Sequence, residues 1–354
     1  MAISSAPSLT CVARFPRTRV LAWDGDVLYA ARRYELVRCR PEKALLENVP
    51  IVWESVARFS PVWWRKLTSA SKLGFRLVRD GFHALAVLPS GELIAALPSA
   101  IATLRPGERE FRITHAVQRG TRPLNFAVSP DGRIFWGEYF DNPKGDAVHI
   151  YGSEDRGATW KVVYSFEKNA IRHVHNIAHD RWANCFWVLT GDVGAECRVV
   201  RASLDFGRVE SVISGNQQAR AVAAVPKEDG LYFASDTPLE QNYIYKLDRQ
   251  GGLSRLGKIH ASVLCGGAVS NAMFFTTMIE PSAVNRDRSI AIYGSEAGGP
   301  WSRLQSWSKD RWPEGFFQYG NGLLATGNNA TNLLAVTTIA VKENDLEASL
   351  FRVK

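Results

Sequence analysis

Hydrophobic residues in this sequence come in short runs and rarely with helical spacing. β-Branched and aromatic runs such as Phe186–Thr190 and Leu231–Ala234 alternate with turns rich in Gly, Asp, Asn and Pro. Long segments with a 3.6-residue period are nearly absent. This pattern predicts an all-β protein built from many short strands.

Three stretches in the middle of the chain repeat one pattern. Each begins with an arginine, continues into an apolar strand, turns, and returns in a second apolar strand that ends at an acidic residue. They span residues 122–138, 172–192 and 220–236, and their arginines lie 50 and 48 residues apart. A third apolar strand follows in each (148–151, 198–201 and 243–247), and a fourth follows in turn, for example 161–166. Four strands about every 40–50 residues is typical of a β-propeller blade.

Four further units extend the repeat over the whole chain. They span residues 20–38, 82–96, 266–293 and 317–353, and the last of them offers only about three strands. Residues 8–15 can supply its fourth strand, which would close the ring and remove exposed sheet edges. We therefore predict one domain over residues 1–354, a seven-bladed β-propeller closed by its N- and C-terminal strands; six blades is the alternative.

Residues 60–79 fit no blade and lie between the first two. Trp63, Leu67, Ala70 and Leu77 have roughly helical spacing, Gly74 interrupts the pattern, and five Arg and Lys residues make the segment basic. One interpretation is a helix that packs on the propeller. The other is a helix that rests on anionic lipid or on a partner.

Composition narrows the classes of function. Lys and Arg exceed Asp and Glu by 43 to 35, a net charge of +8, and no apolar run approaches the roughly 20 residues of a membrane helix. The N-terminal residues lack the pattern of a signal peptide. The five cysteines are scattered, which favours reduced thiols and a cytoplasmic location. No basic stripe with stacking aromatics predicts a nucleic-acid partner.

One eight-residue motif carries a family resemblance. Residues 153–160 (SEDRGATW) match the Asp-box pattern S-x-D-x-G-x-T-W at every fixed position, and residues 294–301 (GSEAGGPW) are a degenerate copy without the Asp. The chain therefore resembles the sialidase-like, Asp-box (BNR-repeat) propellers. The resemblance implies that the box is a structural hairpin between the outer two strands of a blade, and it raises the expectation of carbohydrate chemistry.

Charged residues of three successive repeats are expected to meet at one end of the central channel. In a blade, the loop entering the innermost strand and the loop after the second strand open on the same face. The entering positions are Arg122, Arg172 and Arg220, and the exit positions are Glu138, Asp192 and Asp236, followed four residues later by Asn142, Glu196 and Glu240. Three guanidinium groups there can bind a carboxylate. Alternatively, each arginine pairs with a neighbouring acid in a structural network.

Histidines are expected at the same channel mouth. His173 and His175 alternate along one strand and therefore point to one face, and His83 aligns with Asn125 and His175 in the repeat. Imidazole can act as an acid or base near neutral pH. It can also bind a divalent metal ion beside Glu138 or Asp192.

The family resemblance adds two further expectations. Sialidases hold the substrate carboxylate with three arginines, and they draw a tyrosine nucleophile from the final blade. Tyr319 enters the inner strand of the last unit here, and Glu240 or Glu280 would take its proton.

Two functions follow as hypotheses. The first is an enzyme acting on an acidic saccharide, with the arginines and His83, Asn125 and Glu240 binding substrate. As a hydrolase it would use Glu138, Asp192, Asp236 or Tyr319; as a lyase it would use His173 or His175 as the base. The second is a non-catalytic propeller that binds a glycan or a protein.

Overall fold

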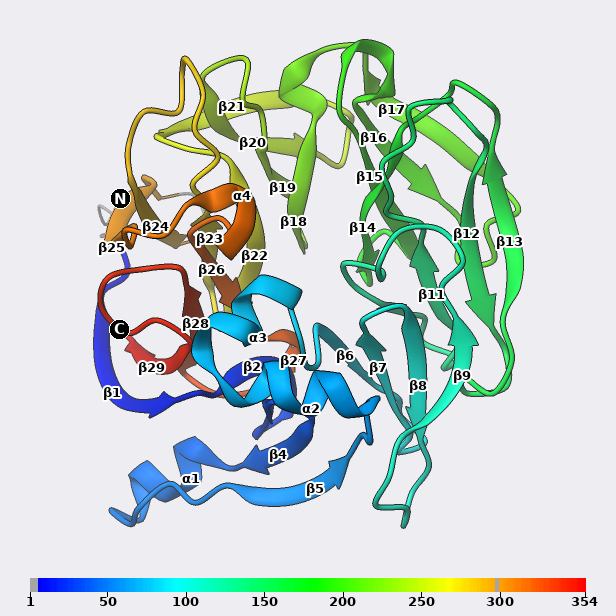
Figure 1. Ribbon diagram of the computed structural model, residues 1–354. Coiled ribbons are helices and arrows are strands. Elements are labelled where there is room, and N and C mark those ends of the chain that lie inside the picture. Colours follow the sequence, from blue (N-terminus) through cyan, green and yellow to red (C-terminus); the bar gives the residue numbers. More distant parts are fainter. Residues whose placement is uncertain (1–5, 297–298) are drawn as a thin grey trace.

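The strands form a ring of seven sheets around a central channel (Figure 1). The computed structural model describes residues 6–296 and 299–354, and within these residues every sheet contains at least four strands. The prediction of a seven-bladed β-propeller is confirmed, and the six-bladed alternative is wrong. Among the described residues, no helix is both long and apolar enough to cross a membrane.

Six blades are contiguous in sequence, and each runs from its innermost to its outermost strand. In chain order their strands are β2 (Arg19–Gly25), β3 (Val27–Arg32), β4 (Glu35–Cys39) and β5 (Glu54–Arg58); β6 (Ala84–Val87), β7 (Leu93–Leu97), β8 (Ala100–Leu104) and β9 (Arg112–Ala116); β10 (Ala127–Val128), β11 (Ile134–Gly137), β12 (Val148–Ser153) and β13 (Lys161–Phe166); β14 (His173–Asp180), β15 (Cys185–Gly191), β16 (Arg198–Ala202) and β17 (Val209–Ser214); β18 (Ala221–Lys227), β19 (Gly230–Ser235), β20 (Asn242–Asp248) and β21 (Leu253–Ile259); and β22 (Val263–Val269), β23 (Ala272–Thr277), β24 (Ser289–Glu296) and β25 (Ser302–Ser308).

The seventh blade joins the two ends of the chain. It contains β26 (Asn321–Leu324), β28 (Leu333–Ile339), β29 (Glu347–Val353) and, outermost, β1 (Leu9–Pro16). β1 pairs antiparallel with β29 from Leu9 opposite Val353 to Pro16 opposite Glu347, so the predicted closure by the N-terminal strand is confirmed. Between β26 and β28, β27 (Thr326–Asn329) pairs in parallel with β2 and ties the last blade to the first.

In the part of the chain that the structure describes, helices occur only between strands. They are α1 (Pro41–Leu46), α2 (Trp63–Ala70), α3 (Lys72–Val78), α4 (Glu314–Phe317) and the short 3-10 turns η1 (Gly194–Glu196) and η2 (Gln217–Ala219). The basic insertion therefore contains two helices, α2 and α3. The helix breaks at Ser71, whose backbone is extended and whose Oγ accepts a hydrogen bond from the N–H of Gly74. Gly74 thus lies in the first turn of α3, and Ser71 is the N-cap that starts this second helix.

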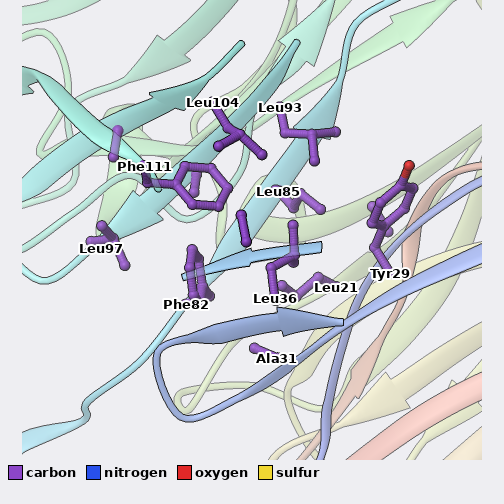
Figure 2. Packing of buried hydrophobic residues seen from close by; sticks show 14 of the residues in the cluster. Leu21, Tyr29, Ala31, Leu36, Phe82, Leu85, Leu93, Leu97, Leu104 and Phe111 are labelled. Carbon is purple, nitrogen blue, oxygen red and sulfur yellow. The ribbon is translucent and has the colours of Figure 1, made fainter. Parts of the chain in front are cut away.

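The core lies between blades as well as within them. Figure 2 shows one cluster that the first two blades share, in which Leu21 and Leu36 face Phe82, Leu85 and neighbouring residues. Phe82 and Leu36 are fully buried. Because each blade buries one face against the next, the ring positions the ends of its innermost strands at fixed places around the channel.

The Asp-box forms a tight hairpin between β12 and β13, the outer two strands of the third blade. Both carboxylate oxygens of Asp155 accept hydrogen bonds from Thr159, at 2.8 Å from its N–H and 2.6 Å from its hydroxyl. Gly157 adopts φ 81°, a conformation that favours glycine. Asp155 therefore has a structural role here. Of the degenerate copy, Ala297 and Gly298 lie outside the described residues.

Candidate functional site

Arginines and acids of successive blades meet where the innermost strands begin. Arg220 directly precedes β18 and Asp236 directly follows β19, and the N–H of Asp236 donates to the carbonyl of Arg220 at 2.8 Å. The antiparallel register of each blade brings these two positions together on the same end of the channel. The loops of neighbouring blades then complete the channel mouth.

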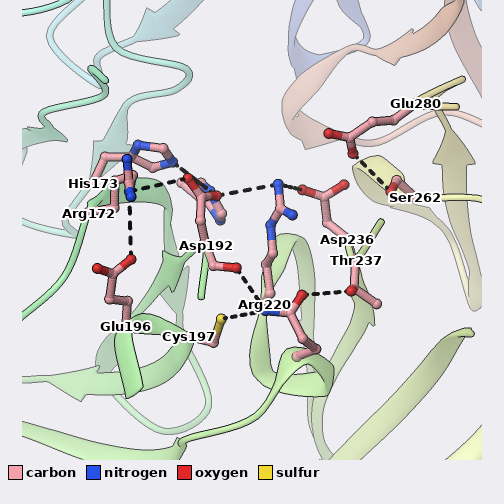
Figure 3. Close-up of polar contacts among 12 residues, drawn as sticks. Arg172, His173, Asp192, Glu196, Cys197, Arg220, Asp236, Thr237, Ser262 and Glu280 are labelled. Atoms are coloured by element: carbon pink, nitrogen blue, oxygen red, sulfur yellow. Dashed lines mark hydrogen bonds and ion pairs between the residues drawn. The ribbon is translucent and has the colours of Figure 1, made fainter. Parts of the chain in front are cut away.

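Arg220 joins acids from two blades (Figure 3). Its Nη2 lies 3.3 Å from Oδ1 of Asp192 and 3.6 Å from Oδ2 of Asp236. Arg172 lies at the rim of the same cluster. Its Nη1 is 3.3 Å from Oδ1 of Asp141, and its Nε is 3.8 Å from Oε2 of Glu196 and 4.0 Å from Oδ2 of Asp192.

His173 and His175 point their rings at one another beside Asp192. Their Nε2 atoms are 2.9 Å apart, and each lies 3.6 Å from Oδ1 of Asp192. Nδ1 of His173 lies 3.0 Å from the carbonyl oxygen of Phe140, and Nδ1 of His175 lies 2.9 Å from that of Ala221. Since a carbonyl only accepts hydrogen bonds, both Nδ1 atoms carry protons. Both imidazoles are buried.

The two central carboxylates have opposite electrostatic environments. Burial alone would raise the pKa of Asp192, but the neighbouring His173 and His175 lower it below its ordinary value. Burial raises the pKa of Asp236 to about 8, although Arg220 opposes this increase. Asp192 is therefore ionised at neutral pH, while Asp236 retains a proton over much of this range.

The opposite side of the mouth is cationic. Arg19 is the first residue of β2, and its Nη2 donates to the carbonyl of His83 at 3.2 Å. Burial lowers the pKa of Arg19 to about 10. Burial and the nearby charges of Arg19 and Arg79 lower the pKa of Arg122 to about 9. Burial and the same three arginines hold the pKa of His83 well below its ordinary value. In the described part of the chain, no carboxylate oxygen lies within 4.0 Å of the guanidinium of Arg19 or Arg122.

Four of the expected site residues have contacts outside the Asp192 cluster. Glu138 accepts hydrogen bonds from Arg119 and, at 2.8 Å, from the N–H of His149. Asn125 donates to Asn176 and to the carbonyl of Ile177 and so links two inner strands. The other two, Glu240 and Tyr319, lie on loops at the face of the channel mouth. Glu240 accepts from Gln218 at 2.7 Å, and Tyr319 is 37 % exposed. Among the described contacts, none joins Tyr319 to Glu240 or Glu280.

Some residues of the channel mouth, among them Arg19 and Tyr139, were not predicted from the sequence. Arg19 stands at the start of an innermost strand, as Arg220 does. Its position in the repeat could therefore have identified it as a residue of the channel mouth. Tyr139 directly follows Glu138, and its ring lies 4.4 Å from that of His173. Burial raises the pKa of Tyr139, and the charges of Asp192 and Asp236 add to this effect. No repeat pattern distinguishes Tyr139 from other aromatic residues in loops.

Comparisons with known proteins give the fold alone. No family model matches the sequence, and no curated protein matches it. A chain in a crystal structure of the mitotic checkpoint complex superposes with a TM-score of 0.58 at 10 % identity, covering 98 % of this chain and 96 % of that one. The WD40 β-propeller domain of Doa1 gives 0.56 at 12 % identity, with 99 % and 97 % covered. A chain of a nidogen/laminin complex gives 0.50 at 11 % identity, with 86 % and 97 % covered.

The fold is a seven-bladed β-propeller. At these identities, the shared architecture says nothing about chemistry. Five buried side-chain atoms around the mouth have no hydrogen-bond partner among the described residues: Arg19 Nε, Arg172 Nε, Arg220 Nε, Glu196 Oε2 and Asp236 Oδ1. A mouth with both unpaired donors and unpaired acceptors can bind a polar ligand.

Proposed function

We propose that this protein is a binding propeller whose channel mouth takes a carboxylate-bearing ligand, an acidic saccharide. The observation that carries the proposal is the pair Arg19 and Arg122, two half-buried residues whose guanidiniums have no acidic partner among the described residues. Partial burial of a cation without a counter-charge costs free energy, and an anionic ligand would supply that charge.

The other side of the mouth supports a sugar as the rest of the ligand. Sugar hydroxyls both donate and accept hydrogen bonds, which suits the unpaired atoms of Arg220, Glu196 and Asp236. The ring of Tyr139 offers an apolar surface beside them. The resemblance to Asp-box propellers is consistent with this class of ligand.

Binding is preferred to hydrolysis because two of the four candidate hydrolytic residues, Glu138 and Tyr319, have their contacts outside the cluster of Asp192 and Asp236. Glu138 is engaged by Arg119, and Tyr319 makes no described contact with the proposed glutamate partners. A uronate lyase is the second candidate, favoured by one observation. The Nε2 atoms of His173 and His175 carry no proton in the neutral imidazoles, and they lie beside the Asp192–Arg220 pair, where a base would be needed.

One titration tests the proposal. We expect an oligogalacturonate to bind in calorimetry, and the same oligosaccharide with its carboxylates reduced to alcohols to bind at least about tenfold more weakly. Equal affinity for the two, or no binding of either, would contradict the proposal. Ultraviolet absorbance of the same mixtures distinguishes binding from lyase activity, because elimination forms an unsaturated uronate that absorbs.

A further inference from the structure

We infer that His173, His175 and Asp192 bind a divalent transition-metal ion. The inference deepens the proposed function and rests on the same channel mouth. One imidazole nitrogen from each histidine and one carboxylate oxygen from Asp192 all lie within 4.8 Å of one another. Two imidazoles and one carboxylate form a common ligand set for such ions, with further positions left open for water or ligand.

The proton positions give the strongest argument for a cation. Because both Nδ1 atoms donate to backbone carbonyls, each neutral imidazole has a lone pair on Nε2. These two lone pairs face each other at 2.9 Å. Such an approach is repulsive unless a cation, either a metal ion or a shared proton, lies between the nitrogens. Two nitrogens bound to one metal ion at about 2.1 Å each, with an angle of about 90° at the ion as in octahedral coordination, lie roughly 3 Å apart, which matches this separation.

The surroundings also fit a metal site. Metal-binding histidines commonly donate their second N–H to a carbonyl or carboxylate, which fixes the ring and its tautomer, and Phe140 and Ala221 supply such carbonyls here. Arg220 approaches Oδ1 of Asp192 at 3.3 Å, so the ion would share this oxygen with a cation. The nearby Glu196 offsets part of that positive charge. A ligand carboxylate could then bridge the ion and Arg220.

Metal titration of the full chain tests this inference. After dialysis against EDTA and removal of the chelator, we expect Zn²⁺ or Mn²⁺ to bind in calorimetry with one ion per chain. Co²⁺ should give visible absorption typical of nitrogen and oxygen ligands. His173→Ala and Asp192→Asn should each weaken binding at least about tenfold. Asp192 is the more exposed ligand and gives the variant that perturbs folding least.

A matched control is available in the fifth and sixth blades. Nε2 of His260 lies 3.6 Å from Oδ2 of Asp287, the same separation as in the candidate site but with only one histidine. His260→Ala should leave metal affinity unchanged. Absence of stoichiometric binding by all three ions, or binding that survives His173→Ala and Asp192→Asn, would overturn the inference and leave a shared proton between the rings. Oligogalacturonate binding measured in EDTA reports separately on the proposed function.

An independent observation concerns the insertion, whose two helices are turned with their apolar side outward. On the inner side, Arg65 and Thr68 bind the buried carboxylate of Asp80 at 2.7 and 2.5 Å. Arg76, also buried, pairs with Asp310 and donates to the carbonyl of Phe317 at 3.0 Å. Polar contacts therefore fix the insertion to the propeller. The apolar stripe seen in the sequence does not perform this role.

That stripe is exposed. The outer face consists of large apolar side chains that are between 41 and 73 % exposed: Val62, Trp63, Leu67, Leu73, Leu77 and, on the neighbouring α4, Phe316 at 71 %. Figure 1 shows α2, α3 and α4 together on one face of the ring. Because α2, α3 and α4 all precede innermost strands, this is the face of the channel mouth. A contiguous exposed apolar patch marks an interaction surface.

We propose that this outer face rests on an anionic membrane surface. Residues 62–79 contain five cations and no acidic residue. Lys66 and Arg79 are exposed and have no carboxylate within 4.0 Å among the described residues, so their charges remain available. A tryptophan and leucines flanked by cations are typical of helices that lie in the lipid interface. A protein partner or a second copy of the chain is the competing occupant.

Vesicle sedimentation distinguishes these occupants. We expect binding to vesicles of phosphatidylcholine with about 30 % phosphatidylglycerol, and at least about fivefold less to phosphatidylcholine alone. The Trp63→Ser, Leu67→Ser variant should lose most of this binding. Leu253→Ser, Leu256→Ser removes two other exposed apolar side chains, from β21, and should keep this binding. No binding to anionic vesicles, or a dimer in light scattering that the Trp63 and Leu67 variant dissolves, would overturn the proposal.

Discussion

Replacing Arg19 and Arg122 together with glutamine is expected to weaken oligogalacturonate binding at least about 100-fold. Hydrogen bonds to a charged group contribute about 1.5–3 kcal/mol each, so two guanidiniums on one ligand correspond to at least two orders of magnitude. Each single variant should lose about tenfold. Calorimetry at fixed ionic strength measures the effect, because long-range attraction alone would depend on salt.

A measurement of stability distinguishes ligand binding by Arg19 and Arg122 from a structural role of these residues. Arg19 and Arg122 lie near one another and Arg79 without a described acidic partner, so their removal relieves repulsion. The double variant should therefore unfold at an equal or higher denaturant concentration, as expected where charge is retained for binding. The control is Arg112→Gln, Arg208→Gln, which removes the same charge from side chains that are 76 and 83 % exposed. A stable double variant that still binds within threefold of the parent would contradict the anchoring role.

The repeat made the fold predictable from the sequence. A propeller blade recurs as four strands with the same order of apolar and turn residues, so each copy supports the assignment of the others. The incomplete unit at 317–353 and the unassigned strand at 8–15 fitted together because an open ring would leave two sheet edges. The parallel pairing of β27 with β2 has no such signal, since it depends on the path of one loop.

Register also predicted which residues lie at the channel mouth, but not how they are paired. Arg172, Arg220, Asp192 and Asp236 meet as their positions in the repeat suggest. Glu138 holds the equivalent position, yet Arg119 engages it, because a longer loop brings this arginine to it before β10. Arg119 has no place in the repeat pattern. Side-chain pairing depends on loop conformation, which one sequence does not specify.

For the helical insertion, the sequence identified an apolar stripe but did not show whether the stripe faces the core or the solvent. Spacing alone identifies an apolar stripe on a helix, and such a stripe usually faces the core. Here the buried positions are Ser69 and Arg76, and the stripe faces outward. The deciding contacts join Arg65 to Asp80 and Arg76 to Asp310, the second pair being distant in the sequence.

Asp236 should make the protein less stable as the pH rises. Burial raises the pKa of this carboxyl from 3.8 to about 8 in the folded chain, while Arg220, Asp192 and Glu280 surround it. Between these two values the folded state holds a proton that the unfolded state has lost. The free energy of unfolding therefore falls with increasing pH, by up to about 1.4 kcal/mol per pH unit from this group alone.

The comparison with Asp236→Asn isolates this contribution, because asparagine resembles the protonated acid and does not titrate. Buried histidines such as His175, whose pKa burial lowers, add an opposite slope near pH 6, but they are present in both proteins. We expect the difference in unfolding free energy, parent minus variant, to decline steadily in urea titrations with EDTA between pH 4.5 and 7.5 and to level off above about pH 8. Asp131→Asn should give a constant offset, since the pKa of this exposed acid is lowered by its bond to Ser129 and stays below that window. Parallel curves for the parent and Asp236→Asn would mean that Asp236 is ionised throughout and that Arg220 neutralises it as a simple ion pair.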